Sequence, residues 1–336
     1  MVVEKVPNFW GETPAQEYYE SQGVKNQKEL FETPQGRLFT QSWLPLNEKP
    51  KGVVCLTHGY TSDTGWTFQI ITIAVAQMGY AAYAADMPGH GRSYGLPGYV
   101  PNFDSAAASL LHFYKSVRDR KEYEGLPHFL FGESMGGMMT LLMHFQDPKG
   151  WDGIILSAPL ISVGHSMTVP WSTLMAFKII SPLMGTWQIP TAKTNVTVNV
   201  IRDPVKAKLI FSNPRRYVGA TRVKTRLEVE RVSAYFIQNL ANVSVPFLVL
   251  HGKEDNMTDP LASQKLYEVA GSRDKTLRLY EGAYHSLIQG ELDETRAHVL
   301  RDIRSWLDLR SSTKGGVELC MSSSIVDPSV GPVLSS

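Results

Sequence analysis

The chain has 336 residues, of which 43% are hydrophobic and 10% aromatic, enough for a large core and too many for a disordered protein. Its 33 basic and 32 acidic residues leave a net charge of +1, which gives no bias toward nucleic acid or another polyanion. Only two cysteines, Cys55 and Cys320, are present, so a disulfide framework and a cysteine-based metal site are excluded. We predict no metal, no other cofactor and no nucleic-acid partner.

Residues 1–28 are mixed in character and rich in Tyr and Glu, and we expect an N-terminal arm that packs on a globular body. The first residues, MVVEKVPNFWGETP, lack the uninterrupted apolar stretch of a signal peptide. We therefore expect a cytoplasmic location.

After the arm, short apolar runs alternate with longer segments of helical character. Strands are predicted at 38–43, 53–57, 81–85, 129–131, 153–157, 247–251 and 276–280, and helices at 66–78, 104–120, 134–146, 260–270 and 293–309. This alternation predicts an α/β fold with a mostly parallel central sheet and helices on both faces. We assign 29–159 and 241–310 to its core.

Residues 160–240 interrupt the alternation and are interpreted as a helical lid inserted between two core strands. Its apolar stretch approaches membrane-spanning length, but Lys178, Pro170 and Pro182 interrupt it, which argues against a transmembrane helix. Lid side chains that could line a substrate tunnel, touch a membrane surface or simply pack on the body include Trp171, Leu174, Phe177, Met184 and Trp187. Residues 311–336 are polar and predicted to form a flexible tail.

The stretch FLFGESMGG contains the pattern G-x-S-x-G, with Gly132 and Gly136 two residues either side of Ser134. An apolar strand precedes this serine and a helix-like MMTLLMHF follows it. That context is typical of a nucleophile elbow, in which a strained turn exposes the serine and its neighbours must be small. We predict that Ser134 is a catalytic nucleophile.

A serine nucleophile needs a base and an acid, which in this fold follow it in the order Asp or Glu, then His. His285 lies in a loop after a predicted strand, whereas His298 falls inside a helix, so His285 is the expected base. The loop KEDNMTDP offers three acids. Asp255 is favoured; Asp259 precedes a proline and suits a helix N-cap, and Glu254 stays an alternative.

Negative charge that develops on a substrate oxygen needs backbone donors. We expect one N–H from Met135, directly after the serine, and the other from Tyr60 in the early loop LTHGYTSD. His58 and Asp63 in this loop also have an H-x4-D spacing, which occurs in some acyltransferases and leaves that activity as an alternative.

Six motifs together resemble the monoacylglycerol lipase family of α/β-hydrolases: LTHGYTSD, GHGRS, LFGESMGG, SAPL, LHGKED and YEGAYHSLIQGE. The resemblance spans about residues 8–310 and is greatest to the plant branch, which includes caffeoylshikimate esterases and lysophospholipases. It implies the same triad, Ser134, Asp255 and His285, and the same oxyanion donors. It also implies that Thr258 stands where the animal lipases have a pocket cysteine, and that Tyr60 replaces part of their HGAGEH-like loop.

The resemblance and the apolar lid predict a serine carboxylic-ester hydrolase that works through an acyl-enzyme on a lipid or phenolic ester. A monoacylglycerol or lysophospholipid is the first candidate substrate and caffeoylshikimate the alternative. A hydrolase-fold receptor with slow turnover is a third reading. The basic lid residues could bind an acidic substrate or form a solvated face; they are Arg215, Arg216, Arg222, Lys224 and Arg226. The sequence leaves the oligomeric state open.

Overall fold

The computed structural model describes residues 8–189 and 200–314, and its core is one eight-stranded sheet in the order β1-β2-β4-β3-β5-β6-β7-β8. The strands are β1 (Val24–Thr33), β2 (Gly36–Pro45), β3 (Val53–Thr57), β4 (Ala81–Ala85), β5 (His128–Glu133), β6 (Gly153–Ser157), β7 (Phe247–Gly252) and β8 (Lys275–Tyr280). β1 and β2 pair in antiparallel fashion, and β2 meets β4 in the same way. From β4 to β8 all pairings are parallel, which confirms the predicted fold class.

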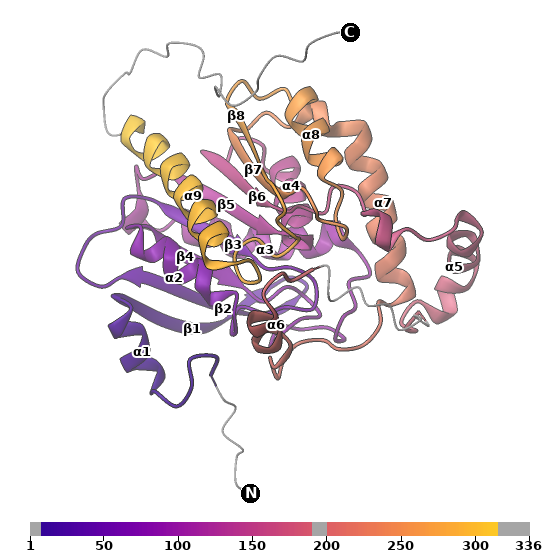
Figure 1. Ribbon diagram of the computed structural model, residues 1–336, viewed down its shortest axis with the longest axis horizontal. Helices are drawn as coiled ribbons and strands as arrows, with labels where there is room; N and C mark the ends of the chain where they lie inside the picture. The colour runs from indigo at the N-terminus through magenta and orange to yellow at the C-terminus, as the bar shows by residue number, and fades with distance from the viewer. Residues whose placement is uncertain (1–7, 190–199, 315–336) are drawn as a thin grey trace, which may run out of the picture.

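Helices cover both faces of the sheet, as Figure 1 shows. They are α1 (Ala15–Ser21), α2 (Gln69–Gln77), α3 (Phe103–Arg118), α4 (Met135–Gln146), α5 (Trp171–Met184), α6 (Pro204–Phe211), α7 (Val223–Asn239), α8 (Pro260–Val269) and α9 (Asp293–Lys314). One hydrophobic core joins α3, α4, α7 and α8 to one face of the sheet. A second core joins α2 and α9 to the other face.

The central strands are buried on both faces, and this explains their continuous apolar sequences. In β3, for example, Val53 and Cys55 belong to one core and Val54 and Leu56 to the other. Strand β1 was not predicted, and it begins inside the segment 1–28. Its sequence VKNQKELFET is mostly exposed at the edge of the sheet, so it lacks the apolar signal of the inner strands.

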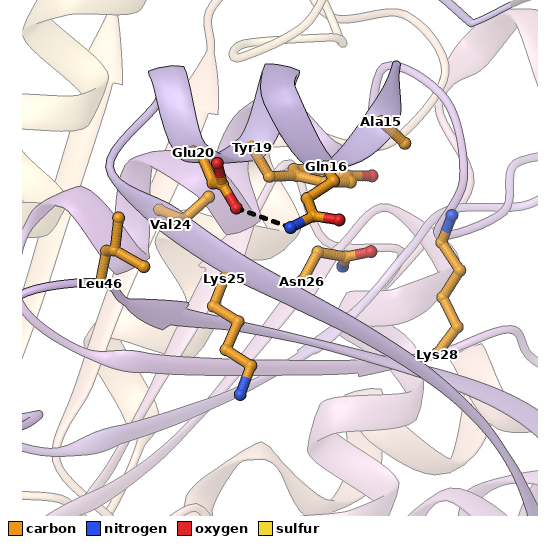
Figure 2. Close-up of a pocket in the computed structure, with 9 residues that line it drawn as sticks. All are labelled: Ala15, Gln16, Tyr19, Glu20, Val24, Lys25, Asn26, Lys28 and Leu46. Carbon is orange, nitrogen blue, oxygen red and sulfur yellow. Dashed lines mark hydrogen bonds between the residues drawn. The ribbon is translucent and has the colours of Figure 1, made fainter.

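The N-terminal helix α1 packs against β1 and buries Tyr19, whose hydroxyl group donates a hydrogen bond to Gln69. Figure 2 shows the pocket between α1 and β1, with Lys25 and Lys28 at its edge. None of the residues that line it takes part in the site described below. At the other end of the chain, α9 continues to Lys314, past the predicted start of the tail; the rest of the predicted tail lies outside the described residues.

Helices α5, α6 and α7 lie between β6 and β7, where the sequence places the lid. Figure 1 shows α5 at the right-hand edge of the molecule, beyond α7. Within the described ranges, no helix is both long and apolar enough to cross a membrane.

Candidate active site

Ser134 occupies a strained turn between β5 and α4, with φ 55° and ψ −118°. A non-glycine residue at positive φ is uncommon and is found where the fold holds it in place. The flanking glycines explain the G-x-S-x-G pattern directly. A Cβ at Gly132 would lie 2.2 Å from the carbonyl oxygen of Gly136, and one at Gly136 would lie 2.2 Å from that of Thr57.

The three side chains expected to act together form one hydrogen-bonded chain. Ser134 Oγ lies 2.9 Å from His285 Nε2, and His285 Nδ1 lies 2.7 Å from Asp255 Oδ2. Because Nδ1 faces a carboxylate, it carries the proton and Nε2 accepts from the serine. Asp255 follows β7, and His285 follows β8, so both side chains reach Ser134 from the carboxyl ends of parallel strands.

The other acids and the other histidine considered above lie elsewhere. Asp259 caps the N-terminus of α8 and accepts the Leu261 N–H at 2.9 Å. Glu254 and His298 are exposed. This leaves Asp255 as the carboxylate that contacts His285.

Asp255 is surrounded by hydrogen-bond donors. Its Oδ1 accepts the backbone N–H groups of Met257 at 2.8 Å and Thr258 at 3.2 Å. Its Oδ2 accepts the Thr258 hydroxyl group at 2.8 Å and His251 Nε2 at 3.0 Å, in addition to His285. The carboxylate is therefore fixed by donors from its own loop and from β7.

His251 was not predicted to be part of the site. It lies inside the apolar strand β7 and is fully buried, where a histidine resembles an ordinary core residue. Its Nδ1 accepts from Ser263 Oγ at 2.7 Å, which leaves the Nε2 proton for Asp255. The four-residue spacing from His251 to Asp255 is the only trace of this contact in the sequence.

The ionisation of the pair follows from these contacts. Burial alone would raise the pKa of Asp255, but the His285 charge and the hydrogen bonds from His251 and His285 hold it well below its usual range. Burial alone would lower the pKa of His285, but the charge and hydrogen bond of Asp255, with a contribution from Glu133, raise it above the ordinary histidine value. Asp255 is thus ionised, and His285 is prepared to take a proton.

Gly59 brings the early loop against the elbow, since a Cβ there would lie 3.3 Å from Ser134 Cβ. The next residue is Tyr60, whose hydroxyl group donates to the Gly98 carbonyl at 2.9 Å. Within the described ranges, the backbone N–H groups of Tyr60 and Met135 donate to no protein acceptor. Both are therefore available to a ligand at Ser134.

His58 supports this loop and has no nitrogen left for catalysis. The Met87 N–H donates to its Nε2 at 2.9 Å, and its Nδ1 donates to the Gly59 carbonyl at 2.8 Å. Burial lowers its pKa, so the ring stays neutral. Nothing in this arrangement lets His58 and Asp63 act as a base and its partner, and the acyltransferase alternative based on their spacing loses its support.

Two cavities meet at Ser134. The Met135 cavity, of about 80 Å³, is mainly apolar and is lined by Met135, Leu160, Val163, Met167, Val229 and Thr258. The His285 cavity, of about 290 Å³, is also mainly apolar but carries more polar groups; its lining includes Ile201, Ile210, Phe211, His285, Gln289, Glu133, Arg216 and Ser62. Tyr60 and Ser134 line both.

The structure brings only one of the six expected substrate-binding residues, Thr258, to these cavities. The other five lie on α5 or just after it and line neither cavity; they are Trp171, Leu174, Phe177, Met184 and Trp187. The physical reason is that α5 packs against α7, and it is α7 that supplies Thr225, Arg226 and Val229 to the cavity lined by Ser134. Arg226 of α7 is only 5% exposed and forms an ion pair with Glu230. It is therefore not part of a solvated basic face of the lid.

A serine at a nucleophile elbow, hydrogen-bonded to a histidine and a buried carboxylate on a mostly parallel sheet, defines a serine hydrolase of the α/β-hydrolase fold. The comparisons with known proteins agree. The family described as "Serine aminopeptidase, S33" matches residues 48–293. The chain belongs to this family of α/β-hydrolases, and the expectation of an enzyme is confirmed.

Its relatives include the proteins that the motifs resemble. The chain is 49% identical over 303 residues to caffeoylshikimate esterase of Arabidopsis thaliana, covering 90% of this chain and 91% of that protein. It is 28% identical over 278 residues to monoglyceride lipase of Homo sapiens, covering 83% and 89%. A soluble variant of monoglyceride lipase from Saccharomyces cerevisiae shares the fold, with a TM-score of 0.74 at 24% identity over 85% of this chain and 96% of that one.

Proposed function

We propose that this enzyme hydrolyses carboxylic esters through an acyl-enzyme. The observation that carries the proposal is the continuous hydrogen-bonded chain from Ser134 Oγ through His285 to the ionised Asp255. In this proposal the first residue is the nucleophile, the second the general base and the third the acid that orients it.

The acylation step uses each of these groups once. His285 Nε2 takes the proton of Ser134 Oγ as the oxygen attacks the ester carbonyl carbon. The oxyanion that forms accepts from the free N–H groups of Tyr60 and Met135. The C–O bond to the alcohol then breaks, and the alcohol leaves with the proton from His285. Water attacks the acyl-serine by the same route, with His285 as base, and the carboxylic acid is released.

The position of His285 supports a proposed role for each of the two cavities. The leaving alcohol takes its proton from His285, so it must lie in the cavity that His285 lines. The acyl group then occupies the other cavity, the Met135 cavity, which has the smaller share of polar lining.

Two substrate classes are supported by different observations. The apolar Met135 cavity and the monoglyceride lipase relatives favour a monoacylglycerol or lysophospholipid. The higher identity to a caffeoylshikimate esterase favours a phenylpropanoid ester. Values of kcat/KM for 2-monoacylglycerol, lysophosphatidylcholine and caffeoylshikimate, measured side by side, rank these candidates.

The reaction itself is tested with Ser134→Ala. We expect hydrolysis of every active ester to fall by a factor on the order of 10⁶, and labelling by a fluorophosphonate probe to disappear. Near-wild-type hydrolysis by purified Ser134→Ala would refute the assignment. A wild-type protein that is labelled but turns over each ester only very slowly would instead indicate the receptor reading.

We also propose that α5 contacts a membrane surface. Its apolar side chains are unusually exposed: Trp171 by 75%, Ile179 by 77%, Leu183 by 90%, and Trp187, just after the helix, by 60%. Exposed apolar patches of this kind occur where a protein meets a membrane or a partner. Binding to phospholipid vesicles tests this proposal, and the cytoplasmic location stays a prediction.

A further inference from the structure

Arg216 is a half-buried cation in the cavity that holds Ser134 and His285. Its guanidinium group lies 4.6 Å from the centre of the Phe211 ring. In the part of the chain that the structure describes, this group makes no ion pair and no hydrogen bond. A guanidinium group has five N–H donors, and stacking on a ring satisfies none of them. Burial lowers the pKa of Arg216 because its charged form loses hydration, and an anion placed beside the group would offset that loss.

The backbone around Arg216 is fixed to the loop that carries Tyr60. Asn213 accepts the Arg216 N–H with its carbonyl group at 3.1 Å and donates from Nδ2 to Asp63 at 2.6 Å. The next residue, Tyr217, donates its N–H to the Thr61 carbonyl at 3.3 Å. These hydrogen bonds anchor the backbone of residues 213–217 to the loop of Tyr60, and this places the Arg216 side chain beside the site.

The other charged groups near Arg216 leave its charge uncompensated. Glu133 lines the same cavity, but its carboxylate accepts from Gln289 Nε2 at 2.7 Å and does not pair with the arginine. Arg215 lines an adjoining cavity that shares Ser62 and Arg216. Arg215 also makes no ion pair within the described residues. The two arginines together make this side of the site positive.

We propose that Arg216 binds an oxyanion carried by the alcohol part of the ester substrate. This inference rests on the proposed function, because the leaving alcohol is placed in the cavity that His285 lines. The oxyanion is a carboxylate or a phosphate, since a planar guanidinium group binds either through two parallel N–H···O bonds. Neutral esters lack this contact, so Arg216 determines the preference for an acidic alcohol over a neutral one.

The test uses pairs of esters with the same acyl group, of which one member carries an anionic group on the alcohol part and the other does not. One pair is caffeoylshikimate and its methyl ester; the other is a 1-acylglycerol 3-phosphate and the same 1-monoacylglycerol. For each pair the preference is the ratio of kcat/KM for the charged and the neutral member. In wild-type enzyme we expect a preference for the charged member of at least one pair, and that pair identifies carboxylate or phosphate. Arg216→Gln should reduce this preference on the order of ten- to a hundredfold, the range expected for a lost charge-assisted hydrogen bond.

Two variants separate a local contact from a general effect of charge. Arg216→Lys keeps the charge but not the paired donors, and should lose part of the preference. Lys208→Gln removes the same charge from an exposed position of α6 and should keep the preference. The proposal is overturned if Arg216→Gln leaves both preferences intact or if Lys208→Gln reduces them equally.

Binding can be measured without turnover, which separates this inference from the proposed function. In a Ser134→Ala background, calorimetry compares the Kd of each charged ester with and without Arg216→Gln. A tenfold or larger increase in Kd supports the anion contact even if no ester is hydrolysed quickly. Equal Kd values refute it even where Ser134 proves to be the nucleophile.

Discussion

Thr258 offers a way to test whether the carboxylate network is built for catalysis. It lines the Met135 cavity, yet its hydroxyl group lies 2.8 Å from Asp255 Oδ2 and 3.2 Å from the Ala158 carbonyl. The oxygen is therefore engaged with the protein. Thr258→Val keeps the shape of the side chain and replaces the hydroxyl group by a methyl group.

The expected magnitude follows from that one contact. A hydrogen bond to a charged group contributes about 1.5–3 kcal/mol, and Thr258 is 2% exposed, so water cannot replace the donor. We expect the free energy of unfolding to fall by about this amount in Thr258→Val. The remaining negative charge of Asp255 is then less stabilised and attracts the His285 proton more strongly. Because the hydroxyl oxygen also lies 3.3 Å from His285 Nδ1, the substitution removes a contact with both members of the ion pair. We therefore expect the pKa of His285 to rise, but by less than the full energy of the lost hydrogen bond would give.

The assay is kcat/KM against pH on a soluble neutral ester, together with urea unfolding. The acid limb of the profile should move to higher pH in Thr258→Val, with KM little changed. Thr258→Ser retains the hydroxyl group and is the matched control. If Thr258→Val raises KM and leaves both the pH profile and the stability unchanged, the hydroxyl group binds substrate. Its hydrogen bond to Asp255 then has no role in catalysis, and the reasoning is refuted.

Two further predictions concern protonation and the surface. Because the base must be neutral and Asp255 raises the pKa of His285 above its ordinary value of about 6.5, wild-type kcat/KM should fall as pH decreases through that pKa. It should be roughly thirtyfold or more lower at pH 5 than at pH 8, and a profile that stays flat down to pH 5 would contradict this role. Replacing Ile179 and Leu183 together by Asp should weaken sedimentation with phosphatidylcholine vesicles by about tenfold or more. The same double variant should retain kcat/KM on a soluble ester; undiminished vesicle binding would show that α5 is not the contact surface.

The central strands could be predicted well because burial on both faces gives them an unmistakable composition. Residues 53–57, 81–85 and 153–157 were predicted with the bounds that the structure shows. The edge strand β1 escaped prediction because most of its side chains face solvent and its register comes from pairing with β2. Such pairing is a long-range property that local composition does not contain.

The three side chains of the hydrogen-bonded chain could also be selected from the sequence. Each lies just after a strand, and parallel strands bring their carboxyl ends to the same edge of the sheet. The contact of His251 with Asp255 could not be predicted, because it depends on which face of β7 the histidine occupies. A shift of one residue in that register would direct its side chain to the opposite core.

In the lid, hydrophobicity does not indicate which helix lies beside Ser134. The apolar helix α5 attracts attention in the sequence, but none of its residues is buried. Helix α7 has a far more polar sequence, yet Val229, Val232 and Phe236 join the core above the sheet, and this anchors Thr225 and Arg226 at the Met135 cavity. The anchoring of Arg216 through Asn213 and Asp63 likewise joins residues 150 positions apart. Arg216, in a polar stretch, thus lines the cavity that holds Ser134, while the apolar helix α5 lines neither cavity, because proximity to Ser134 is decided by which segment the core holds. Substrate preference in this enzyme is therefore expected to respond to Arg216 more than to any apolar side chain of α5.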